Sequence, residues 1–225
     1  MPDFVTENAN GTRSPAGRVS VDSGTVAIAN GGQFPDYLTQ PLPSVGKGWV
    51  ATTSGYGDGG YDVLRVVDAD GAVVGVEVVF ISPTLEAAGA QALLAELGEG
   101  CTKEQRFAYW DGTLDDHAAR RVRQRMAAEQ PIRQRVWDEG LAGLHPAADA
   151  TPRLLGRIAI SGQVDVGDPC YEVPSLEVEV TPGTYDAVAW MFDAGEGWGI
   201  RVARLGIYRS GRGPTGDGDE LERLT

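Results

Sequence analysis

The sequence predicts an α+β protein dominated by β structure, in which two related antiparallel β units, arranged like a sandwich, are joined by a helical section. Apolar runs of strand length fill both ends of the chain, apolar residues at helical spacing fill the middle, and 31 glycines in 225 residues supply many tight turns. We expect a flexible arm over residues 1–17, a first β unit over 18–82, a helical section over 83–152, a second β unit over 153–210 and a mobile tail over 211–225.

Two elements occur in the same order in each half of the chain. The first is a pair of short strands around a turn, found in residues 17–28 and again in residues 156–166. The second is a Tyr-Asp strand that ends in an Asp-Ala turn, found in residues 61–71 and again in residues 185–195. Each pattern is typical of a β-hairpin. An ancient duplication explains this order better than chance does.

The helical section carries recognisable helix starts. Thr84 is placed to cap a first helix, and Thr102 with Gln105 three residues later forms a capping-box pattern before a second. Thr113 precedes a stripe of apolar residues at i, i+4 spacing, which predicts a third helix. Pro131 suits the first turn of a fourth helix, so residues 113–144 are expected to form a helical hairpin.

Composition restricts the possible partners. The formal net charge of −13 repels a phosphate backbone, which disfavours binding to nucleic acid. No window of the sequence approaches eighteen apolar residues, so no membrane span is expected. The first seventeen residues lack the pattern of a signal peptide, and the two cysteines suggest no disulfide framework or zinc site. We therefore expect a cytoplasmic protein without a cofactor or a bound metal.

Three short motifs resemble a known family. They are Val21-Asp22-Ser23-Gly24, Asp168-Pro169-Cys170-Tyr171 and the glycine-rich segment that runs from Gly55 to Tyr61. Together they resemble a set of small β-rich proteins of actinobacteria and their phages, which share a domain of unknown function. The resemblance covers about half of the chain and omits the helical section. It implies β structure and implies no activity.

The glycine-rich loop over residues 54–60 is the part of the Tyr-Asp element that the second copy lacks. It has no lysine and precedes a strand, so a tight turn is favoured over a phosphate-binding loop. Four carboxylates in and after this loop could bind calcium, but their spacing favours a role as turn residues. They are Asp58, Asp62, Asp68 and Asp70.

Cys170 would need a nearby base to act as a nucleophile, and neither His117 nor His145 lies in a recognisable catalytic context. A buried cysteine that acts as a small hydrophobic residue is therefore favoured.

Basic residues concentrate in one segment of this acidic chain. Residues 120–135 contain six arginines and one acid, Glu129, which gives the segment a formal charge of +5. Complementary charge fixes the orientation of a docked surface. The segment is either a solvated helix face or an interaction surface. Such a surface would dock on an acidic β surface, in its own chain or a second copy, or on another protein partner. The arginines are Arg120, Arg121, Arg123, Arg125, Arg133 and Arg135.

No catalytic motif stands out, so the sequence favours a non-enzymatic protein-interaction module, of an inhibitory or immunity-like kind. The alternative is an enzyme or small-molecule binder that uses a cleft between the two β halves. The candidate binding residues for such a cleft come from the three family-like motifs. They are Asp22, Tyr56, Asp58, Tyr61, Asp168 and Cys170.

Overall fold

The computed structural model describes residues 11–35, 41–55, 57–170, 175–197 and 199–210. The chain divides into two compact units. The β unit comprises Met1–Phe80 and Thr151–Thr225, and the helical unit comprises Ile81–Ala150. The predicted fold class, α+β with β structure dominant, is confirmed. The first strand already begins at Thr12, so part of the predicted arm is strand.

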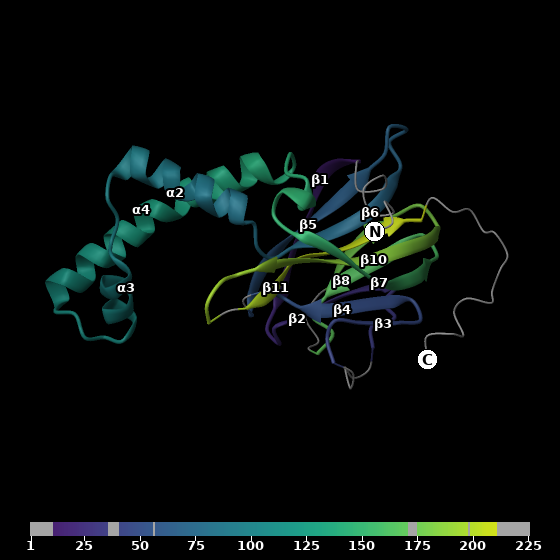
Figure 1. The fold of residues 1–225 in the computed structure, drawn as a ribbon, viewed down its shortest axis with the longest axis horizontal. Helices are drawn as coiled ribbons and strands as arrows, with labels where there is room; N and C mark the ends of the chain where they lie inside the picture. The colour runs from purple at the N-terminus through teal and green to yellow at the C-terminus, as the bar shows by residue number, and fades with distance from the viewer. Residues whose placement is uncertain (1–10, 36–40, 56, 171–174, 198, 211–225) are drawn as a thin grey trace. The chain divides into compact units, whose positions relative to one another are not determined.

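The β unit consists of two antiparallel sheets (Figure 1). A Cβ placed on Gly156 would lie 3.3 Å from Val45, and one placed on Gly17 would lie 3.0 Å from Leu176, each in the other sheet. The sheets therefore pack face to face as a sandwich. The six-stranded sheet has the order β1 (Thr12–Val21), β5 (Gly59–Val67), β6 (Val73–Val79), β11 (Ile200–Arg209), β10 (Gly183–Asp193), β7 (Thr151–Ile160). The five-stranded sheet has the order β3 (Ser44–Gly46), β4 (Trp49–Thr53), β2 (Thr25–Asn30), β8 (Gln163–Gly167), β9 (Leu176–Glu179).

The six-stranded sheet has the same strand order from either edge when the two halves of the chain are aligned. β1, β5 and β6 run inward from one edge, and β7, β10 and β11 run inward from the other. The two Tyr-Asp strands, β5 and β10, thus occupy matching positions. Each sheet is shared between the halves rather than built by one of them. A common origin of the halves stays a prediction, with which this order agrees.

The segment around Asp22-Ser23-Gly24 connects the two sheets and is not a hairpin. β1 pairs with β5 in the six-stranded sheet, whereas β2 pairs with β4 and β8 in the five-stranded sheet. The corresponding strands of the second half, β7 and β8, are likewise in different sheets. Both hairpin predictions are wrong here, because turn residues show that the chain reverses and do not show which strand it pairs with.

The two Tyr-Asp elements do form the predicted antiparallel pairs, β5 with β6 and β10 with β11. In the first, Asp68 Oδ1 accepts hydrogen bonds from the backbone nitrogens of Asp70, at 3.0 Å, and Ala72, at 2.9 Å. Gly71 follows with φ +83°, a conformation that glycine adopts without strain. The turn chemistry is local, which is why the sequence predicts it.

A buried ion-pair network lies on the six-stranded sheet. The strand register and the alternation of side chains place it on the face opposite Gly17 and Gly156, away from the second sheet. Glu77 Oε1 lies 2.7 Å from Arg13 Nη2, and Glu77 Oε2 lies 3.2 Å from Arg204 Nη1. Both Glu77 and Arg204 are fully buried. The carboxylate therefore joins β1, β6 and β11.

Two aromatic side chains extend this network. The Tyr208 hydroxyl donates to Glu77 Oε1 at 2.9 Å, and it accepts a hydrogen bond from Trp190 Nε1 at 2.9 Å. Burial, and next the charge of Glu77, raise the pKa of Tyr208 well above its ordinary value. The phenol therefore stays protonated and remains a donor to the carboxylate.

Replacing Glu77 with glutamine should lower the free energy of unfolding by about 3–5 kcal/mol, because two buried guanidinium groups lose their counter-charge. Urea unfolding at neutral pH measures the effect. Glu179→Gln on the exposed side of β9 is the matched control and should stay within about 0.5 kcal/mol of wild type. Equal effects of the two substitutions would contradict the assigned role of Glu77.

The helical unit contains α2 (Pro83–Leu97), α3 (Lys103–Trp110), α4 (Asp116–Leu141) and a short 3-10 helix, η1 (Pro146–Ala148). α2 packs along α4. The predicted capping box of Thr102 and Gln105 is confirmed at the start of α3. The other two N-caps differ from the prediction, since Ser82 caps α2 and Asp115 caps α4. Among the helices that the structure describes, none is both long and apolar enough to cross a membrane.

α4 continues through Pro131 instead of breaking there. The predicted helical hairpin is therefore one helix of 26 residues with a proline inside it. An interior proline removes a backbone hydrogen bond and crowds the carbonyl four residues earlier. Ile132 and Leu141 are buried on this helix, and their packing outweighs the local cost of the proline.

Replacing the exposed Pro131 with alanine should raise the stability of the helical unit by about 1–3 kcal/mol, because a helical hydrogen bond is restored. Thermal unfolding followed by circular dichroism measures it. Ala128→Gly, one turn earlier, should change stability in the opposite direction by about 1 kcal/mol. A lower melting temperature for Pro131→Ala would show that the proline is not a cost to this helix.

Candidate functional site

The three family-like motifs come together in the β unit. They lie in the connection between β1 and β2, the connection between β4 and β5, and the loop that follows β8. We call this cluster the turn junction, comprising residues 22–24, 54–55, 57–58 and 168–170. The backbone nitrogen of Ser54 donates to Gly24 O at 2.9 Å. A Cβ placed on Gly24 would lie 3.7 Å from Gly57 Cα and 3.9 Å from Asp58 Oδ1. The chain segments that carry Asp22, Asp58, Asp168 and Cys170 are therefore near one another, whereas a cleft lined by their side chains stays a prediction.

Asp168 holds the turn junction together. Its Oδ2 accepts from the backbone nitrogens of Asp22 and Ser23, both at 2.8 Å. Its Oδ1 accepts from Ser23 Oγ at 2.7 Å and from the backbone nitrogen of Cys170 at 2.9 Å. Burial alone would raise the pKa of Asp168, but the hydrogen bonds, that of the Ser23 hydroxyl foremost, lower it below its ordinary value.

These contacts leave little chemistry for the Asp168 carboxylate to perform. An ionised carboxylate offers about four acceptor positions, and four donors already occupy them. A low pKa also makes it a poor proton acceptor near neutral pH. The geometry supports a structural role, in which the carboxylate fixes the turn that carries the chain from one sheet to the other.

Tyr61 holds the glycine-rich loop in a similar way. Its hydroxyl lies 2.9 Å from Ser54 O and 2.5 Å from Gly57 O, and its ring makes an edge contact with Phe80. Burial raises the pKa of Tyr61, the hydrogen bond to Ser54 opposes this, and the charge of Asp58 adds to the increase. The loop is fixed by the tyrosine that ends its motif.

The remaining predicted binding residues differ in their surroundings. The side chains of Asp22, Asp58 and Cys170 are exposed. The expectation of a buried Cys170 is therefore wrong, since the residue lies in the loop after β8 and outside the core. Tyr56 lies outside the described residues.

The suggested calcium cluster is not assembled. Asp58 and Asp68 lie before and after the nine-residue strand β5, which separates them by about 30 Å. Asp68 is engaged in its own turn.

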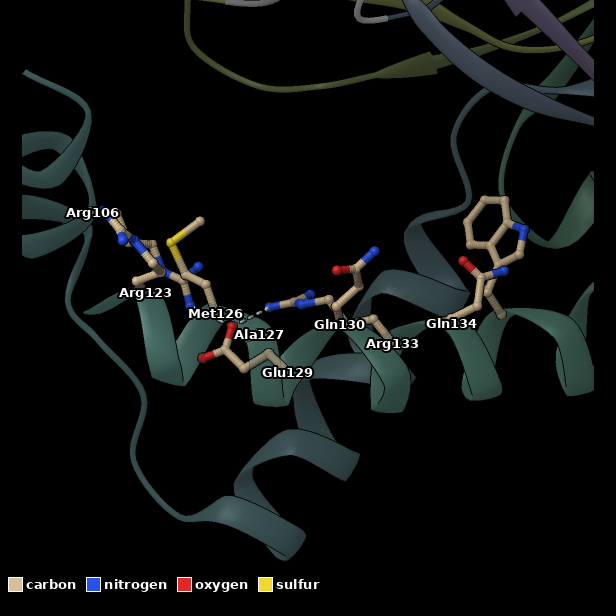
Figure 2. A pocket seen from close by; sticks show the side chains of 9 residues that line it. Arg106, Arg123, Met126, Ala127, Glu129, Gln130, Arg133 and Gln134 are labelled. Carbon is tan, nitrogen blue, oxygen red and sulfur yellow. Dashed lines mark hydrogen bonds and ion pairs between the residues drawn. The ribbon is translucent and has the colours of Figure 1, made fainter. Parts of the chain in front are cut away.

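The helical unit carries a surface groove that we call the arginine groove. It is an open groove of about 620 Å³ along α4. Figure 2 shows Met126, Gln130 and Gln134 projecting from one side of the helix, with Arg106 and Arg123 gathered toward one end. The groove is lined by Arg106, Arg123, Met126, Ala127, Glu129, Gln130, Arg133, Gln134 and Trp137.

Glu129 organises the charges beside the groove. Its carboxylate is almost fully buried and lies 2.6 Å from Arg106 Nη2, 3.1 Å from Arg125 Nε and 3.9 Å from Arg133 Nη2. Burial alone would raise the pKa of Glu129, but hydrogen bonds from Arg106 and Arg125 lower it below its ordinary value. One buried carboxylate thus holds three guanidinium groups, and Arg133 remains about half exposed.

The six predicted arginines separate into different roles. Arg123 and Arg133 line the arginine groove, and Arg123 Nε also donates to the Tyr109 hydroxyl at 3.1 Å. Arg125 instead donates to Leu97 O and Gly98 O, both at 2.7 Å, and so caps the end of α2. Arg121 lines a second, smaller cavity with Arg125, Arg135 pairs with Glu96, and Arg120 is exposed.

Sequence reasoning missed three features of the arginine groove. Arg106 lies on α3, outside the basic segment, and reaches α4 only through the fold. Met126 and Trp137 fit the apolar helical pattern of this segment, which does not show that both are partly exposed in the groove. The available signal was a second stripe on α4, because residues 123, 126, 130, 133 and 137 recur at spacings of three and four.

Comparison of the chain with protein-family models, curated proteins and solved structures found no match. The resemblance to the actinobacterial and phage family stays a prediction. The function proposed below rests on the geometry of the described residues.

Asp168→Asn should lower the free energy of unfolding by about 2–3 kcal/mol at neutral pH, because a buried charged acceptor loses part of its hydrogen bonding. The folded-state pKa of Asp168 is lowered, so its stabilisation is present above the unfolded pKa of about 4 and is lost as the pH falls through the folded value. Urea unfolding from neutral to acid pH should show the difference between wild type and variant shrinking. The exposed Asp58→Asn is the control, and a difference that does not change with pH would contradict the assignment.

Proposed function

We propose that the protein is a non-enzymatic interaction module that binds an acidic segment of a protein partner in the arginine groove. The observation that carries this proposal is the composition of the groove. Three guanidinium groups, a tryptophan and a methionine line one open surface, and these residue types are enriched where proteins bind each other. An inhibitory or immunity-like role is the form of binding that we propose for it.

The helical unit also exposes two aromatic side chains on α3, outside the lining of the groove. Trp110 is 70% exposed and Phe107 is 59% exposed, on the helix that also supplies Arg106 to the groove. Aromatic side chains are enriched in protein–protein interfaces, so both are available to a partner that extends beyond the groove. The rigid anchoring of Glu129 and its arginines keeps the charges in place before binding, which lowers the entropic cost of association.

The alternative of an enzyme or small-molecule binder places the site at the turn junction. The motifs meet there, which favours this alternative, but the central carboxylate is saturated with donors from its own chain. The interaction proposal therefore has the stronger physical support.

Gln130→Glu tests the proposal with little disturbance of the fold. Gln130 is exposed at the centre of the groove, and the substitution leaves the ion pairs around Glu129 in place. A new negative charge there should weaken capture of the acidic partner at least tenfold, or about 1.4 kcal/mol. The measurement is quantitative capture from a lysate of the native host by the immobilised protein.

Gln124→Glu is the matched control. It makes the same chemical change on α4, but residue 124 lies about 120° around the helix from Gln130. A partner retained equally by wild type and both variants would exclude the groove as its binding surface.

A further inference from the structure

We infer that the occupant of the arginine groove is an α-helix with carboxylates along one face, which lies lengthwise on α4. This inference rests on the proposed function and specifies the partner's structure. Three observations support it: the spacing of the groove residues along α4, their position around the helix, and the distance between their charges.

Five of the eight groove residues on α4 follow a helical seam. Arg123, Met126, Gln130, Arg133 and Trp137 alternate between steps of three and four, an average of 3.5 residues. This is the spacing with which one helix accepts the side chains of another in a coiled coil. Fourteen residues extend about 21 Å along the axis, which is the length of four helical turns.

The groove seam is offset around α4 from the helix's buried seam, and Glu129 of the buried seam borders the groove. Val122, Glu129 and Ile132 are the buried residues along the middle of α4. Each groove residue at 123, 130 and 133 directly follows one of them, so the two seams lie about 100° apart around the helix. A helix placed in the groove would therefore form a third member beside α2 and α4 without displacing α2.

Charge separation argues for the same occupant. Arg123 and Arg133 are ten residues apart, or about 15 Å along the axis. A partner helix would match them with carboxylates at a similar separation and would cover Met126 and Trp137 with apolar side chains. An extended peptide would gain no backbone hydrogen bonds from a helix surface, whereas a helix satisfies its own.

Three synthetic peptides of equal length test this inference. The first is a capped peptide of leucine and alanine heptads with glutamate at the e and g positions. The second has lysine in place of glutamate, and the third is the acidic peptide with two central prolines that break the helix. Calorimetry gives the affinity of each for the full-length protein, and circular dichroism gives the helix content gained on binding.

The acidic peptide should bind at least tenfold more tightly than the lysine peptide and should gain helix content on binding. Arg123→Glu with Arg133→Glu should reverse the preference between the two peptides. Arg121→Glu should leave it unchanged, because Arg121 lies about 180° around α4 from Gln130. The circular dichroism spectrum of each variant without peptide shows whether its own fold is kept.

Equal binding of the proline-containing peptide, or binding without a gain in helix, would overturn the helical occupant. Tighter binding of the lysine peptide would overturn its acidic character. Concentration-dependent dimerisation that Gln130→Glu abolishes would assign the groove to a second copy instead.

If the host partner is lost with Gln130→Glu while no peptide binds as a helix, the inference fails and the proposed function stands. If capture is also insensitive to Gln130→Glu, both fail.

Discussion

The Glu77 carboxylate imposes the main constraint on the β unit. It is fully buried and bonds to Arg13, 64 residues away, and to Arg204, 127 residues away in the chain. A buried charge is tolerated only when its partners are in place, so these strands must be in register together. Since Arg13 belongs to the first half of the chain and Arg204 to the second, neither half can complete the six-stranded sheet alone.

Two other carboxylates, those of Asp168 and Glu129, have different structural roles. Asp168 is saturated by donors from its own surroundings and fixes a connection between the sheets. Glu129 instead positions guanidinium groups, of which Arg133 keeps about half of its side chain in water. A saturated carboxylate has no capacity left for a ligand, whereas a positioned and partly solvated guanidinium still has donors to offer. This contrast is the reason why we propose the binding surface on the helical unit and not at Asp168.

The sequence predicts the local features and misses the distant ones. The turn at Asp68 and the capping box at Thr102 depend on atoms within a few residues, so composition is sufficient to find them. The connection at Asp22-Ser23-Gly24 has the residues of a hairpin turn, and only its distant contact with Asp168 distinguishes a crossing between sheets. Pro131 indicated a helix start, but packing of the whole of α4 decided otherwise. For the proposed binding surface, the sequence predicts the basic segment on α4. It does not predict Arg106, which reaches this segment only in the folded protein.

The strand register shows where the chain leaves the six-stranded sheet for the helical unit and where it returns. Val79 of β6, Arg204 of β11, Trp190 of β10 and Pro152 of β7 stand in one row across the six-stranded sheet. The chain therefore leaves the sandwich and returns to it at one end, three strand spacings or about 14 Å apart. A spacer of about five extended residues would bridge that distance. The helices are thus an insertion between β6 and β7 of a β framework, at a gap that a short linker is long enough to close.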